Sequence, residues 1–260
     1  MKRRGPRRTA LVLRSDELGL PSTGEPRLFL GRLTNDALRG ELEAAGIPGF
    51  LESRGFPAVQ VETDLADGEH RLRIAAGDGA LLVELRLAEM VTPLPEGLRA
   101  AGPPTLHVLA ILWAALQNPR ASFTADRPRL PGQDHPGLGV GRRLYDLLRG
   151  WAGALGKDAL LNVPEHYHNA LFYAAPFRFL EPAEQGRFEA LRRDLADLRV
   201  ADASFAIEQG RVRDESGRTF AWDPGAMVAP VSGTLDAVLL AAPYREAVAA
   251  ARDAARFRVT

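Results

Sequence analysis

Three glycines at alternate positions, Gly137, Gly139 and Gly141, directly precede the strongest amphipathic pattern in the chain. Glycine has no Cβ, so backbone N–H groups in such a turn can approach an anion closely, and the N-terminus of the following helix adds its positive dipole end. Arg142 and Arg143 fall in the first helical turn, where a cation opposes the dipole unless an anion is bound. The pattern predicts a phosphate-binding turn; the alternative is a turn that only lets the helix pack closely. The candidate residues are Gly137, Leu138, Gly139, Val140, Gly141, Arg142 and Arg143.

Histidines form the second group of residues that could do chemistry. His166 and His168 lie together, and His135 directly precedes the glycine turn, so these three of the five histidines would meet if both segments border one cleft. His166 is a candidate general base, and the alternative is a histidine that caps a helix or packs in a loop. With Asp134 the histidines could also form a hydrolytic metal site, although residues two apart point to different sides of a helix. We expect no bound metal.

Tyr173 and two glutamates complete the candidates. A phenol is a good proton donor to a leaving group of similar pKa, so Tyr173 could act as a general acid; the alternative is a tyrosine that lines the core. Glu84 and Glu89 lie on one predicted strand and face opposite sides, so only one can face a cleft. We take Glu84 as the second candidate base, with a solvated strand residue as its alternative.

The predicted elements alternate between helices and strands, which indicates an α/β chain with a mixed sheet. Residues 58–63, 70–75 and 81–91 read as an antiparallel meander, because apolar and polar residues alternate. Residues 106–116 are apolar all round and predict a buried helix. The other predicted helices are at 35–46, 50–53, 138–155, 165–175, 188–198 and 244–256, and the other predicted strands are at 27–30, 159–163 and 177–180. A hairpin is also predicted, in which the apolar residues Phe205, Ile207, Phe220 and Trp222 stand at alternate positions.

Composition excludes several classes of function. The 33 Lys+Arg balance 33 Asp+Glu, which makes nucleic acid an unlikely partner, and the absence of Cys excludes disulfides, thiolate zinc sites and cysteine nucleophiles. The longest apolar stretch is shorter than the ~20 residues that cross a bilayer, so no membrane partner is expected and the chain is predicted to be cytoplasmic. Residues 1–26 hold a basic run, which we interpret as a solvated tail; the alternative is an arm for an acidic partner.

This order of elements resembles the GCN5-related N-acetyltransferase family over residues 27–181, with residues 92–136 as an insertion and residues 182–260 as a C-terminal extension or small second lobe. In that family the glycine-rich turn holds the pyrophosphate of acetyl-CoA, and a splay between the fourth and fifth strands admits the pantetheine arm. The resemblance implies acetyl-CoA as co-substrate. It also implies that strands 81–91 and 159–163 are the splayed neighbours.

The resemblance further implies roles for single residues. Tyr173 would protonate the departing CoA thiolate, Asn169 would contact the cofactor, and Glu84 or His166 would take a proton from the acceptor. The acceptor would be a small-molecule or peptide amine, which the sequence does not identify, and it does not predict the oligomeric state. Two alternatives stay open: a non-catalytic CoA-binding or regulatory protein of the same fold, and a histidine-based metal hydrolase.

Overall fold

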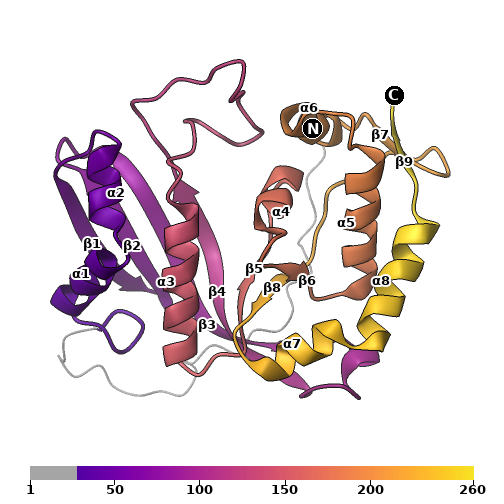
Figure 1. Ribbon diagram of the computed structural model, residues 1–260, viewed down its shortest axis with the longest axis horizontal. Helices are drawn as coiled ribbons and strands as arrows, with labels where there is room; N and C mark the ends of the chain where they lie inside the picture. Colours follow the sequence, from indigo (N-terminus) through magenta and orange to yellow (C-terminus); the bar gives the residue numbers. More distant parts are fainter. Residues whose placement is uncertain (1–27) are drawn as a thin grey trace.

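Seven strands form one mixed sheet in the computed structural model, which describes residues 28–260 (Figure 1). The strand order is β1-β2-β3-β4-β5-β8-β6. Strands β1 to β4 are antiparallel, β4 and β5 are parallel, and β8 is antiparallel to both β5 and β6. The strands are β1 Val59–Ala66, β2 Glu69–Ala76, β3 Leu81–Pro93, β4 Thr105–Leu116, β5 Ala159–Asn162, β6 Arg178–Phe179 and β8 Met227–Pro230. A separate pair consists of β7 Val212–Asp214 and β9 Phe257–Val259.

Helices fill the connections between strands. They are α1 Asn35–Ala44, α2 Ile47–Ser53, α3 Gly141–Ala154, α4 Tyr167–Tyr173, α5 Pro182–Asp194, α6 Val200–Glu208, α7 Gly233–Leu240 and α8 Ala242–Ala254, with a short 3₁₀ turn, η2, at Glu96–Leu98. Among the residues that the structure describes, no helix is long and apolar enough to span a membrane. The basic run predicted in residues 1–26 lies outside the described residues.

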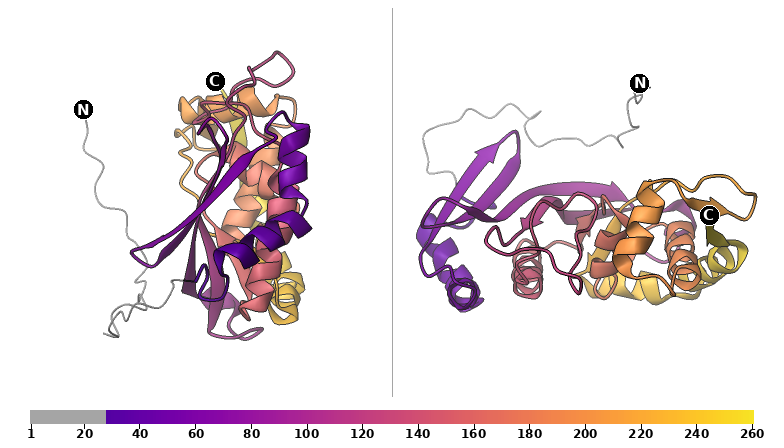
Figure 2. Two further views of the ribbon diagram at one scale, coloured as in Figure 1. Left: turned by 90° about the vertical axis from the view of Figure 1, so that its left-hand side faces the viewer. Right: turned by 90° about the horizontal axis from the view of Figure 1, so that it is seen from above.

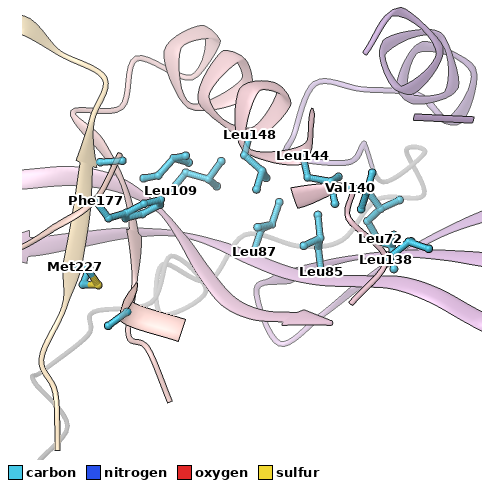
Figure 3. Close-up of a cluster of buried hydrophobic side chains, with 14 of the residues drawn as sticks. Leu72, Leu85, Leu87, Leu109, Leu138, Val140, Leu144, Leu148, Phe177 and Met227 are labelled. Carbon is cyan, nitrogen blue, oxygen red and sulfur yellow. The ribbon is translucent and has the colours of Figure 1, made fainter. Parts of the chain in front are cut away.

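The main core lies between the sheet and helix α3. Leu85 and Leu87 of β3 point toward Leu144 and Leu148 of α3, and all four side chains are buried (Figure 3). This contact is what the four- and three-residue spacing of apolar residues along α3 predicts, because that spacing places them on one face. The predicted meander and helix α3 are confirmed, and the chain is of mixed α/β class.

The predicted buried helix at residues 106–116 is wrong, because this segment is strand β4. Its two faces enter two different cores: Leu109 joins the α3 core, whereas Val108 and Ala110 join a second core with α7 and α8. A strand that is buried on both faces shows no alternation of apolar and polar residues, so its pattern matches that of a buried helix. β4 also separates β3 from β5, so the predicted pairing of strands 81–91 and 159–163 is wrong as well.

Two smaller predictions also fail. Residues 27–30 form no strand within the described residues, only an isolated bridge between Phe29 and Leu33. The predicted alternation at residues 205 and 207 belongs to helix α6, where alanine-rich sequence favours the helix over a hairpin. The C-terminal residues supply strand β8 between β5 and β6, so residues 182–260 add to the same sheet.

The meander has one covered and one uncovered face. Helices α1, α2 and α3 lie on the side to which Leu72, Ile74 and Leu85 point. No described helix lies over the opposite side of β1 to β3, as the right-hand view of Figure 2 shows. Arg71, Arg73 and Glu84 point to this uncovered face because side chains alternate along a strand.

Candidate functional site

Strands β4 and β5 part at the centre of the sheet. Their parallel pairing runs from Val108↔Ala159 to Ile111↔Asn162, and β4 then continues to Leu116 although β5 has ended. On the other side, Leu87 pairs with Ile111 and Arg86 pairs with Trp113, so the bulge residue Leu112 has no register partner on either described neighbour. Bulges of this kind are over-represented next to active sites.

Exposed apolar side chains mark the place where the strands part. Leu112 is 43% exposed, Trp113 is 45% exposed and Val163, which follows β5, is 54% exposed. Such exposure is unusual in the central strands of a sheet, because these are normally covered on both faces. We call the region of Leu112, Trp113, Ala114 and Val163 the β4–β5 opening.

The glycine turn lies directly beside this opening. Leu138 donates its N–H to the carbonyl of Leu116 at 3.1 Å, and Gly137 bridges Gln117, so the turn is fixed to the end of β4. Gly139 has a φ of +86°, which L side chains rarely adopt. No side chain in residues 28–260 caps the N-terminus of α3, where Val140 is the cap residue. The first N–H groups of α3 are therefore available to an anion.

Two arginines beside the turn, Arg54 and Arg143, have no acidic partner in the described part of the chain. Arg54 and Arg143 both stack on the ring of Phe50, with their guanidinium carbons 5.0 and 4.6 Å from its centroid. A Cβ placed on Gly139 would lie 3.6 Å from Nη2 of Arg54. Neither arginine forms a salt bridge with any described residue. Arg142 instead pairs with Asp146 at 3.0 Å, so the two predicted first-turn arginines differ.

The loop between β4 and α3 extends from the glycine turn to His166. At one end Arg120 pairs with Asp78 at 2.7 Å and donates to the carbonyl of Gly55 at 2.8 Å. At the other end a Cβ placed on Gly132 would lie 2.6 Å from Nε2 of His166, so the loop backbone touches the imidazole ring. The glycine turn and His166 thus border one region of the surface.

His166 sits at the N-cap of α4, which starts soon after β5 ends. Asn169 accepts a hydrogen bond on Oδ1 from the N–H of His166 at 3.0 Å, so this predicted cofactor residue closes the helix cap. Nδ1 of His166 lies 3.5 Å from Oε2 of Glu208, which α6 contributes. No sequence pattern indicates Glu208, because the contact depends on how α6 packs against α4.

His168 is stacked on His166 with ring centroids 5.3 Å apart. Burial, reinforced by the nearby charge of His166, lowers the pKa of His168 to about 4, so this side chain is neutral at physiological pH. Its Nδ1 has no hydrogen-bond partner in the described part of the chain, and neither has Oδ1 of Asn162, the last residue of β5. Two buried polar atoms thus lack partners near the end of β5.

The side chains of the alternative metal site do not converge. Within residues 28–260, no group of three or more His, Asp or Glu side chains could hold a metal ion. His166 and His168 stack on each other, whereas Asp134 pairs with Arg129 at 3.4 Å. The arrangement therefore offers a base and its carboxylate neighbour rather than a ligand set.

Tyr173 lies at the end of α4, next to a second tyrosine. The rings of Tyr173 and Tyr145 both contact Phe177, with centroids 5.9 and 6.0 Å away. Burial raises the pKa of both phenols, so both stay protonated at neutral pH. The hydroxyl of Tyr173 has no hydrogen-bond partner among the described residues, unlike that of Tyr244, which donates to the carbonyl of Phe179 at 2.7 Å. Tyr145 is therefore a second candidate proton donor, which no local sequence pattern indicates.

Glu84 lies on the uncovered face of the meander, away from α3. Its Oε1 accepts from Nη2 of Arg86 at 3.2 Å, and Arg86 in turn lies over Trp113, at the β4–β5 opening. Glu89 pairs with Lys157 at 2.5 Å. The two predicted bases, Glu84 and His166, thus belong to different parts of the site.

No model of a known protein family matches the chain, and no curated protein sequence matches it at a significant level.

Proposed function

We propose that the protein is an acetyl-CoA-dependent N-acetyltransferase of the GCN5-related type, which transfers the acetyl group to an amine. The observation that carries this proposal is the uncapped glycine turn at the start of α3, with Arg54 and Arg143 beside it and no acidic partner for either among residues 28–260. Backbone N–H groups at a helix N-terminus together with guanidinium groups suit the phosphates of CoA.

The course of the chain also supports the proposal. The fourth strand, β4, leads into the glycine turn, and the fifth strand, β5, is its parallel neighbour. The resemblance calls for a splay between the fourth and fifth strands, and β4 and β5 part beyond Ile111. Residues 105–116, which the resemblance placed in an insertion at 92–136, are a strand of the sheet.

Each step of the transfer has a candidate group. Acetyl-CoA supplies an activated thioester, whose acyl carbon forms a bond to the amine nitrogen as the carbon–sulfur bond breaks. His166 would accept the proton that the amine loses, and Glu208 would stabilise the imidazolium that forms. Backbone N–H groups at the Leu112 bulge would hold the developing negative charge on oxygen.

Tyr173 would donate the proton that the thiolate takes up. Burial raises the pKa of Tyr173, so the phenol holds its proton at neutral pH before transfer begins. Tyr145 is the second candidate for this role, since it borders the same phenylalanine from α3. Asn169 would act through the position of His166 rather than by direct contact with the cofactor.

The test is CoA release from acetyl-CoA in the presence of a panel of primary amines, with CoA binding measured by calorimetry on the same protein. We expect binding and amine-dependent release. Binding without release for any amine would favour the non-catalytic CoA-binding alternative. Absence of CoA binding would overturn the proposal.

A further inference from the structure

Resting on the proposed acetyl transfer, we propose that the acceptor is an amino acid, held on the uncovered face of β2 and β3 and at the exposed end of β4 by Arg71, Arg86 and Trp113. The amino acid's carboxylate binds the two guanidinium groups, its amine faces the β4–β5 opening, and its apolar side chain packs on the indole.

The three residues form one row across the sheet. Arg71 of β2 is the register partner of Arg86 on β3, and Arg86 is the partner of Trp113 on β4. The guanidinium carbon of Arg86 lies 6.0 Å from the ring centroid of Trp113. Trp113 directly follows the Leu112 bulge, where β4 has lost its pairing to β5. The row therefore ends at the opening where the transfer would take place.

Arg71 and Arg86 face each other as like charges, which is unfavourable for a directly opposed pair in a sheet. Nε of Arg71 is buried and has no hydrogen-bond partner within residues 28–260. Nη2 of the same side chain lies 4.0 Å from Oε2 of Glu69. A buried donor without a partner is costly. A ligand carboxylate between the two guanidinium groups would remove both costs, because guanidinium and carboxylate match as planar, bidentate partners.

Glu84 supplies the opposite charge for the amine. It accepts from Nε and Nη2 of Arg86 through one oxygen, Oε1, at 3.4 and 3.2 Å. A ligand ammonium group beside this carboxylate would lie close to a ligand carboxylate on Arg86. This spacing suits an amino acid, whose two charged groups are joined through one carbon.

The charge of the whole face favours a zwitterion over a polyanion. The charged side chains of two adjacent rows are Asp64, Arg71 and Arg86 in one and Glu62, Arg73 and Glu84 in the other. Acidic and basic groups are equal in number, so the face has no excess positive charge to hold a phosphate or a nucleic acid. The flat, exposed indole of Trp113 adds an apolar surface for the side chain of the ligand.

The two substrates would then approach from opposite sides of the sheet. The glycine turn and Tyr173 belong to the side covered by α3, whereas Glu84 and Arg86 belong to the uncovered side. The β4–β5 opening is the place where both sides meet.

Three matched compounds test the proposal: L-phenylalanine, phenethylamine, which lacks the carboxylate, and 3-phenylpropanoic acid, which lacks the amine. Equilibrium binding to the full-length protein is followed by calorimetry. We expect L-phenylalanine to bind at least about tenfold more tightly than either analogue, because hydrogen bonds to charged groups are lost with each. Equal binding of phenethylamine, or no binding of L-phenylalanine at millimolar concentrations, would overturn the proposal.

The variant Arg86→Gln links this binding to the named residues. With acetyl-CoA present, we expect it to lower kcat/KM for L-phenylalanine at least about tenfold more than kcat/KM for phenethylamine, which has no carboxylate to lose. Arg71→Gln provides the same test if Arg86→Gln does not fold. Arg258→Gln, an exposed arginine of the small β7–β9 sheet, is the control and should change neither value.

The calorimetric titration with CoA separates the two proposals. If CoA does not bind but L-phenylalanine does, the acetyltransferase function fails and the amino-acid site stands as a binding site. If CoA binds and both amines are acetylated equally well, or if Arg86→Gln lowers both reactions alike, the function stands and the amino-acid acceptor is wrong.

Discussion

The two ends of strand β4 have opposite surroundings. From Leu106 to Ala110 most side chains are buried, and β3 and β5 pair on either side. From Leu112 to Ala114 three consecutive apolar residues are exposed, and β5 is no longer paired. The comparison shows how one strand can contribute to the core at one end and to a candidate active site at the other. The change occurs at the Leu112 bulge.

The largest effect should follow from a matched pair of substitutions at the two ends. Leu109→Ala removes a side chain that is 0% exposed and should lower the free energy of unfolding by ~2–5 kcal/mol. Leu112→Ala, at the exposed end, should cost less than ~1 kcal/mol and should impair acetyl transfer. Urea denaturation measures both. Equal losses of stability would show that β4 is equally buried at both ends.

The next effect concerns the buried histidine beside the opening. The pKa of His168 is about 4 in the folded chain, below its usual value of 6.5, so the unfolded state binds the proton more readily. The contribution of neutral His168 to the free energy of unfolding is complete above pH 6.5. This contribution is lost as the pH falls from 6.5 toward 4, at up to ~1.4 kcal/mol per pH unit. His168→Gln should flatten this part of the pH–stability profile. An unchanged slope would show that His168 is accessible to protons in the folded state.

Much of the scaffold was predictable because the burial of its side chains is reflected in short, local patterns of apolar and polar residues. The meander alternates apolar and polar residues since one face is uncovered, and α3 shows a helical apolar stripe since only one side meets the core. β4 was not predictable in this way, because Val108 and Leu109 point to opposite faces and both are buried. The bulge at Leu112 leaves no mark in the sequence, since it is defined only by its register against β3.

The residues of the candidate site also fall into two groups, those that the sequence predicts and those that it does not. The glycine turn was visible because glycine spacing and the following helix are local features. Arg54 and Phe50 were not, because α2 brings them to the turn only through tertiary packing. Glu208 reaches His166 from α6, and Tyr145 meets Phe177 across the space between α3 and β6. Residues that distant elements bring together can be recognised as neighbours only when the fold is known.

A third prediction concerns Tyr173 on the covered side of the opening. Tyr173→Phe keeps the ring on Phe177 but removes the proton donor, so kcat should fall by ~10²-fold while CoA affinity stays near the wild-type value. Tyr145→Phe is the matched control, which should change kcat by less than ~3-fold if Tyr173 is the donor. The reverse result would assign the role to Tyr145.

A smaller effect should distinguish the arginines around the turn. Arg54→Gln removes a guanidinium group that has no acidic partner in the described chain and should weaken CoA binding by ~10-fold, as expected for one charge-assisted hydrogen bond. Arg142→Gln, whose side chain is already paired with Asp146, should weaken binding by less than ~3-fold. Equal effects in calorimetry would show that the turn attracts CoA only through general charge.

The most direct test of the phosphate-binding turn compares two substitutions of Gly141, the first residue of α3. Gly139 is unsuitable, since its φ of +86° would strain any side chain. At Gly141 a Cβ would meet only Leu116 at 3.7 Å, an ordinary contact, so Gly141→Ala should retain CoA binding. Gly141→Asp adds a negative charge that favours the helix dipole, so thermal stability should be unchanged or slightly higher while CoA binding, measured by calorimetry, is lost. Undiminished CoA binding by Gly141→Asp, or no binding by the wild type, would contradict the account.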